Sequence, residues 1–129
     1  MAVPVIDLFA GPGGLGEGFS SIRNIKGENV FKISLSIEKD DSAHKTLELR
    51  SFFRQFPDGE APEEYYRFLR QDGISRDELF SRYKIEAQNA QKESWHYELA
   101  ENNSEEIDIR INEALQNKSI WVLIGGPPC

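Results

Sequence analysis

The sequence contains a single cysteine, Cys129, and it is the last of 129 residues. An intrachain disulfide is therefore impossible, and a reducing, cytoplasmic compartment is expected, as in a bacterial cell. Long apolar runs are also missing, since none approaches the roughly 18 residues that a membrane span needs. The amino terminus lacks the basic flank and long apolar stretch of a signal peptide. We expect a soluble protein with no membrane partner.

Positive charge is scarce, because 15 lysines and arginines face 22 acidic residues and give a formal net charge of −7. This sign does not suit the neutralisation of DNA phosphates, so charge alone indicates no nucleic-acid-binding surface. Histidine is scarce as well: only His44 and His96 are present, without a cysteine or histidine at metal-ligand spacing. We expect no metal site.

The chain is long enough for one compact domain, and its composition, 39% hydrophobic and 29% charged, is that of a globular protein. Residues 3–8 predict a buried strand that ends at a glycine-rich turn, residues 11–14. A helix closing near Gly27 should follow, and then a strand over residues 30–38 with apolar residues at alternate positions. The helix should bury one apolar face made of Leu15, Phe19 and Ile22.

The rest of the chain predicts further alternation of helices and strands. Asp40 or Asp41 can cap a helix that ends before Pro57, and charged, helix-favouring residues 57–93 predict a peripheral helical insertion. A short strand is expected over residues 95–99, and a clean buried strand over residues 120–124. Between them, a helix should bury Ile107, Ile111, Ala114 and Leu115. The predicted class is α/β, with a mostly parallel, doubly wound sheet and helices on both faces.

Residues 11–16, GPGGLG, fit the pattern G-x-G-x-x-G between a strand and a helix, and Glu38 ends the next strand. Glycines allow a tight turn and close approach of a ligand, and a carboxylate at the tip of a strand can accept hydrogen bonds from ribose hydroxyls. A glycine turn and a carboxylate placed in this way suit any adenosine-bearing cofactor. The pattern alone therefore leaves both a nicotinamide dinucleotide and S-adenosylmethionine open.

Two longer strings carry a family resemblance. Residues 7–15, DLFAGPGGL, resemble the first motif of the DNA (cytosine-5)-methyltransferases, and GGPPC at residues 125–129 resembles the fourth. The resemblance implies a partial Rossmann-like methyltransferase fold that binds S-adenosylmethionine. Phe9 would stack on adenine, the backbone after it would hold the methionine part, and Glu38 would bind the ribose. The residues assigned to the cofactor site in this way are Asp7, Leu8, Phe9, Ala10, Gly11, Pro12, Gly13, Gly14, Leu15, Glu38, Lys39 and Pro128.

The family also has an acidic residue that binds the adenine amino group after its third strand. Here Glu98 and Glu101 are the candidates. Lys39 departs from the bulky apolar residue that often follows the ribose-binding acid in the family, so we expect only its methylene stem to pack on adenine.

Cys129 is the candidate nucleophile. Addition of its thiolate to carbon 6 of cytosine would make carbon 5 able to accept a methyl group, after which elimination would restore the ring. The two prolines before it lack N–H groups and fix φ near −65°, so they would hold the cysteine stiffly. Taken alone, a single cysteine is more often an inert thiol.

The resemblance implies that residues 1–129 are the amino-terminal portion of a catalytic, cofactor-binding domain. The target-recognition region that reads double-stranded DNA would lie further along, so this chain by itself is expected to be inactive. Such enzymes often belong to restriction-modification systems. Two alternatives stay open: an NAD(P)-dependent Rossmann oxidoreductase, and a non-catalytic remnant that serves as an interaction module.

Overall fold

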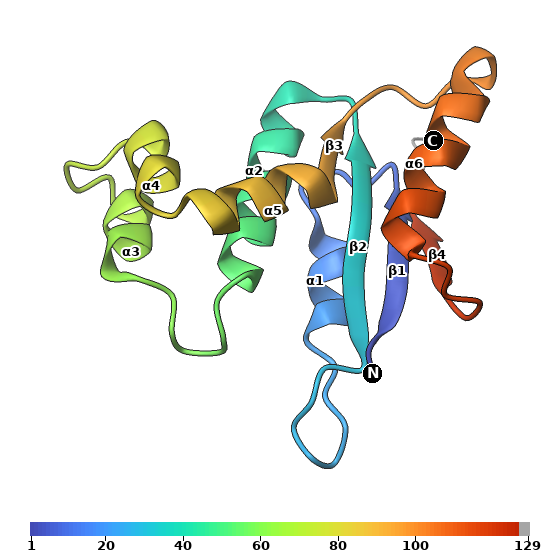
Figure 1. Ribbon diagram of the computed structural model, residues 1–129. Helices are drawn as coiled ribbons and strands as arrows, with labels where there is room; N and C mark the ends of the chain where they lie inside the picture. Colours follow the sequence, from blue (N-terminus) through green and yellow to red (C-terminus); the bar gives the residue numbers. More distant parts are fainter. Residues whose placement is uncertain (127–129) are drawn as a thin grey trace.

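The computed structural model describes residues 1–126 and shows an α/β fold (Figure 1). The strands are β1 (Val3–Leu8), β2 (Phe31–Glu38), β3 (Ser94–His96) and β4 (Val122–Gly125). The helices are α1 (Gly14–Ser20), α2 (Asp41–Arg54), α3 (Glu63–Leu69), α4 (Arg76–Arg82), α5 (Lys84–Glu93) and α6 (Ser104–Leu115), with a 3₁₀ turn η1 (Glu101–Asn103).

The four strands form one sheet in the order β3-β2-β1-β4, and every pairing is parallel. Helix α6 covers one face, while α1 and α2 cover the other and α5 packs on α2 (Figure 1). The predicted α/β class and the mostly parallel sheet are thereby confirmed. No helix within residues 1–126 is both long and apolar enough to cross a membrane.

A bulge in β2 decides which side chains face which helix layer. Val5 pairs with Ile33, but Ile6 pairs with Leu35, so Ser34 is an extra residue in β2. The bulge interrupts the alternation of apolar residues that the sequence shows. Ile33 consequently faces the α1 side, whereas Leu35 packs under α6.

The core beneath α6 forms from the buried face that the sequence predicts for this helix. Ile107 and Leu115 are buried against Ile6, Leu35 and Ile37 of the sheet. Ile111 and Ala114 are partly buried against the same cluster. The spacing of three to four residues between apolar positions in α6 therefore predicts its buried face correctly.

Helix α1 buries only part of the face that the sequence predicts: Phe19 is partly buried and its ring packs on that of Phe31 of β2, with centroids 5.2 Å apart. The helix ends at Ser20, and Leu15 and Ile22 are 47% and 44% exposed. Gly16 is the buried residue of α1, and a Cβ there would lie 3.4 Å from Asp7 Oδ2. The helix approaches the sheet closely because it presents glycine rather than leucine to β1 and β2.

Residues 57–93 contribute no strand to the sheet and form α3, α4 and α5. Helices α3 and α4 project away from the sheet, whereas α5 runs back along α2 towards β3 (Figure 1). They share a second core with α2, centred on Phe52, which stacks on Phe80 at 4.8 Å between ring centroids. Ser75 caps α4 by accepting a hydrogen bond from the backbone N–H of Glu78.

Strand β4 differs from the buried strand predicted for residues 120–124. It begins two residues later, and Ile120 and Leu123 are 75% and 56% exposed. Within residues 1–126, β4 pairs only with β1, so one of its edges has no neighbouring strand. An apolar run alone does not distinguish a central strand from an edge strand, which explains the error.

Gly125 is the glycine whose replacement should disturb the sheet most. A Cβ at this position would lie 2.7 Å from the backbone oxygen of Leu8 on the neighbouring strand. We expect Gly125→Ala to lower the free energy of unfolding by about 1–3 kcal/mol, the usual cost of overpacking. Urea unfolding followed by circular dichroism measures this value.

Gly18→Ala is the matched control for this substitution. Gly18 lies in α1, where an added Cβ meets no atom within 4 Å, so alanine should stabilise the helix by up to about 1 kcal/mol. Equal unfolding curves for Gly125→Ala and wild type would show that β4 moves freely away from β1.

Candidate functional site

A cavity of about 240 Å³ opens at the carboxyl ends of β1, β2 and β3. In parallel α/β sheets, ligands bind at this end of the strands. The residues that line it are Phe9, Gly11, Ile37, Glu38, Lys39, Tyr97, Glu98, Leu99 and Gly126. Four predicted cofactor-site residues are thus brought together here: Phe9, Gly11, Glu38 and Lys39.

Phe9 follows β1 directly and has an unusual backbone conformation. Its φ is 54°, in the left-handed region that few residues other than glycine adopt. Its side chain is 39% exposed at the cavity rather than packed in a core. Strained backbone of this kind concentrates at ligand-binding sites, where the surrounding structure enforces it.

Glu38 joins the glycine loop to the start of α2. Its Oε1 accepts a hydrogen bond from the backbone N–H of Gly11 at 2.8 Å, and its Oε2 accepts one from the N–H of Asp40 at 2.8 Å. Each carboxylate oxygen retains a further lone pair. Glu38 can therefore hold the loop and still accept hydrogen bonds from a hydroxyl-bearing ligand in the cavity.

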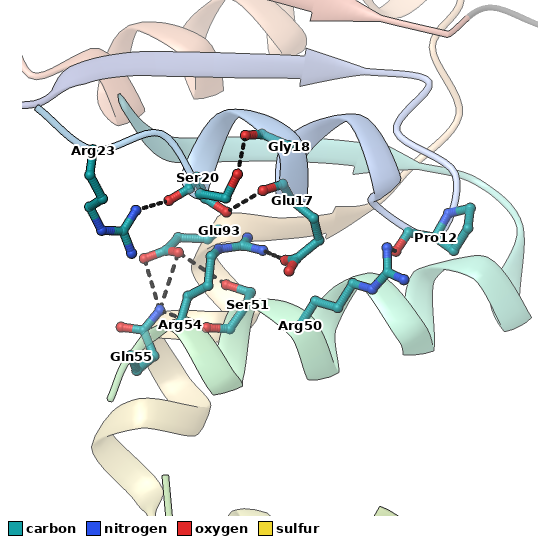
Figure 2. Close-up of polar contacts among 11 residues, drawn as sticks. Pro12, Glu17, Gly18, Ser20, Arg23, Arg50, Ser51, Arg54, Gln55 and Glu93 are labelled. Carbon is teal, nitrogen blue, oxygen red and sulfur yellow. Dashed lines mark hydrogen bonds and ion pairs between the residues drawn. The ribbon is translucent and has the colours of Figure 1, made fainter. Parts of the chain in front are cut away.

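The glycine loop is fixed from below by α2 (Figure 2). Arg50 donates a hydrogen bond to the carbonyl oxygen of Pro12 at 3.0 Å, and Arg54 forms an ion pair with Glu17 of α1. Gly11 and Gly13 have φ values of 59° and 93°, which explains why glycine stands at these positions. The two arginines were not among the predicted residues, because nothing local to α2 reveals a partner more than 35 residues away.

Further contacts hold the two segments that flank the cavity. The rings of His44 and His96 stack with centroids 4.8 Å apart. His96 Nε2 lies 2.8 Å from the carbonyl oxygen of Lys39, and His44 Nε2 lies 2.9 Å from that of Ser94. The histidine pair thus ties α2, β3 and the residue after Glu38 together.

The segment after β3 supplies cavity residues that the sequence did not predict. Tyr97 and Leu99 line the cavity, and so does Glu98, one of two candidates for the adenine amino group. Glu101, the other candidate, opens η1 and is not a lining residue. The one available signal was the apolar alternation that continues from Trp95 through Tyr97 to Leu99.

Other predicted residues occupy positions around the cavity. Leu8 and Ala10 flank Phe9 in the chain, and residues 12–15 form the glycine loop and the start of α1 without lining the cavity. Pro128 and the proposed nucleophile Cys129 lie outside the described residues. Within residues 1–126, no three histidine, cysteine or acidic side chains come together as a metal-ligand set.

Asp7 is buried beneath the loop, and neither of its carboxylate oxygens has a hydrogen-bond partner within the described residues. Burial raises the pKa of this carboxyl from 3.8 to about 6; the charge of Arg54 lowers it and that of Glu38 raises it. A buried acid without a partner destabilises the fold when it is ionised.

The described residues form a parallel sheet with helices on both faces and a glycine loop after the first strand, which is consistent with part of a Rossmann-like methyltransferase fold. The chain is 32% identical to the Type II methyltransferase M.Bpa9945I of Bacillus paralicheniformis over 141 aligned positions. The alignment covers 97% of this chain and 30% of that relative. No protein-family model and no solved structure matches the chain significantly.

The buried carboxyl of Asp7 should make stability depend on pH. Its folded pKa of about 6 lies above the unfolded value of 3.8. The contribution of Asp7 to the free energy of unfolding is therefore fully present below pH 4 and is lost as pH rises through 6. Asp7→Asn removes this loss. We expect the variant to gain about 2–3 kcal/mol relative to wild type between pH 4 and pH 7, from the shift in pKa.

Urea unfolding at pH 4, 5, 6, 7 and 8 on both proteins tests this expectation. The difference in free energy of unfolding between wild type and Asp7→Asn isolates the contribution of Asp7, because all other groups titrate in both proteins. A difference that stays constant with pH would mean that Asp7 is not shifted. Asp108→Asn, at an exposed position that forms no ion pair within residues 1–126, serves as the control.

Proposed function

We propose that this chain is the cofactor-binding part of an S-adenosylmethionine-dependent DNA (cytosine-5)-methyltransferase of a restriction-modification system. The observation that carries the proposal is the cavity that has Phe9 and Glu38 at the ends of neighbouring parallel strands. Similarity to a Type II methyltransferase supports it. So do the residues of the two sequence motifs, DLFAGPGG and GGPPC.

The residues around the cavity suit an adenosine group. Phe9 offers an aromatic ring, Tyr97 and Leu99 offer further apolar surface, and Glu38 offers free carboxylate lone pairs for ribose hydroxyls. Glu98 can accept a hydrogen bond from an exocyclic amino group. Aromatic contact beside a carboxylate is the combination that binds a nucleoside by stacking and by hydrogen bonding at once.

S-adenosylmethionine supplies an electrophilic methyl group when it is bound. The other tasks would fall to the chain. Phe9 and Glu38 would hold the adenosine end, and the backbone from Ala10 to Leu15, of which Gly11 lines the cavity, would hold the methionine end. The arginines of α2 keep that backbone in place, since Arg50 binds the carbonyl oxygen of Pro12.

Cys129 is the nucleophile in this proposal. Its thiolate would form a bond to carbon 6 of an extruded cytosine and leave again when carbon 5 loses its proton. Double-stranded DNA would be read by parts of the protein beyond this chain. The net charge of −7 does not by itself favour binding to DNA phosphates, which agrees with this division.

Removal of the Glu38 carboxylate should weaken cofactor binding. We expect Glu38→Ala to raise the Kd for S-adenosylhomocysteine by about tenfold to 150-fold, which corresponds to about 1.5–3 kcal/mol for hydrogen bonds to a charged group. Glu38→Gln keeps one acceptor oxygen, so its Kd should lie between those of wild type and Glu38→Ala. Titration calorimetry measures each Kd, with reduced nicotinamide dinucleotide as the competing cofactor class.

Glu60→Ala is the matched control, since Glu60 is an exposed carboxylate distant from the cavity lining. Thermal unfolding of every variant separates lost binding from lost folding, because Glu38 also bonds two backbone N–H groups. Equal Kd values for wild type and Glu38→Ala would remove Glu38 from the site. Binding of the dinucleotide alone would favour an oxidoreductase.

The 129-residue chain alone should not methylate DNA. Addition of a thiolate is productive only when the cytosine is extruded and positioned, and such positioning is worth about 7–11 kcal/mol of the barrier. Incubation with radiolabelled S-adenosylmethionine and cytosine-rich duplex should leave the DNA unlabelled. An active cytosine-5 methyltransferase is the positive control. Label that enters DNA with the chain alone, and is lost in Cys129→Ser, would overturn this expectation.

A further inference from the structure

A second and larger cavity, of about 540 Å³, lies along the amino-terminal half of β2. We call it the β2-edge cleft. Its floor includes Lys32 and Ser34 of β2, and its walls include Lys92 of α5 and Arg110 of α6. The candidate cofactor site lies at the carboxyl ends of the same strands, so the two cavities are separate.

The floor of the β2-edge cleft is an open strand edge. Strand β3 has three residues and pairs only with Ser36, Ile37 and Glu38 of β2. In the described part of the chain, residues 31–35 of β2 therefore have no strand beside them on that edge. Such an edge offers a row of backbone N–H and carbonyl groups that can pair with another extended chain.

The β2-edge cleft is positively charged although the chain is acidic. Lys32, Lys92, Arg110 and Lys118 line it, and none of them forms an ion pair within residues 1–126. The guanidinium of Arg110 donates a hydrogen bond to the carbonyl oxygen of Lys92 and stacks over the ring of Trp95. The opposing carboxylate of Glu93 accepts hydrogen bonds from Ser51 and Gln55 of α2 (Figure 2). The four cations thus have Glu113 as their only other acidic neighbour among the lining residues.

We propose that the β2-edge cleft binds an extended acidic peptide segment of a partner protein, which adds a parallel or antiparallel strand beside residues 31–35. The open backbone edge favours a peptide as the ligand, because its N–H and carbonyl groups together are complementary to the backbone of another extended chain. The unpaired cations explain why it is acidic. This inference does not depend on the function of the cofactor site.

The first test uses fluorescein-labelled peptides and the 129-residue chain, with binding followed by fluorescence anisotropy. The acidic probe is an octapeptide of alternating glutamate and valine, and its partner has lysine in place of glutamate. A third peptide keeps the acidic sequence but carries N-methyl groups at alternate amides, which removes donors for strand pairing. The acidic probe should bind at least tenfold more tightly than either of the others. Equal binding of the N-methylated peptide would overturn strand addition.

The second test reverses charge in the β2-edge cleft. Lys92→Glu with Lys118→Glu should weaken binding of the acidic probe at least tenfold. Lys26→Glu with Lys84→Glu makes the same change of net charge at exposed lysines outside the cleft, and should alter binding less than twofold. Amide hydrogen exchange should show new protection over residues 31–35 when the acidic probe is bound.

Two results would contradict the proposal. Absence of binding by the acidic probe to the wild-type chain would remove the cleft as a peptide site. Competition by a 12-base-pair duplex, with duplex binding lost in the Lys92→Glu and Lys118→Glu variant, would mean that the four cations serve nucleic acid instead.

Discussion

The carboxylate of Glu38 is the point on which the candidate cofactor site depends. Parallel pairing brings the ends of β1 and β2 together, and Glu38 then bonds the N–H groups of Gly11 and Asp40 across that junction. The turn after β1 and the first turn of α2 are thus fixed relative to each other. Phe9 is held at the cavity in a left-handed conformation by the same turn. One charged group therefore sets both the shape and the polarity of this end of the sheet.

Local patterns in the sequence predicted the elements that build this junction. An apolar strand, a glycine turn and a second strand with an acid at its tip are all read within about 40 residues. Asp40 also caps α2 by accepting a hydrogen bond from the N–H of Ala43, as expected for its position. Phe9, Glu38 and Lys39 meet in the cavity because each directly follows, or ends, a strand of a parallel sheet.

Features that arise from contacts distant in the sequence were not predictable in this way. The extra residue at Ser34 depends on how β1 pairs with β2, and Leu15 is exposed because Gly16 lets α1 approach the sheet. Tyr97 reaches the cavity only through the order of the strands. Within residues 1–126, strand β4 has the composition of a buried strand and pairs with a single neighbour, β1. The periodicity of apolar residues predicts which side chains of an element can be buried, but it does not predict which other element packs against them.

Two carboxylates, those of Glu38 and Asp7, lie near the ends of neighbouring strands. They differ in solvent accessibility and in hydrogen bonding. Glu38 is partly accessible, bonded to backbone N–H groups and open to the cavity. Asp7 is buried and has no hydrogen-bond partner within residues 1–126, where nearby Arg54 pairs with Glu17 instead, and burial raises its pKa to about 6. Gly16 leaves Asp7 just enough space under α1. Asp7 is predicted as a cofactor-site residue and is not among the residues that line the cavity. A buried acid that lowers stability is more readily retained beside a binding site than elsewhere.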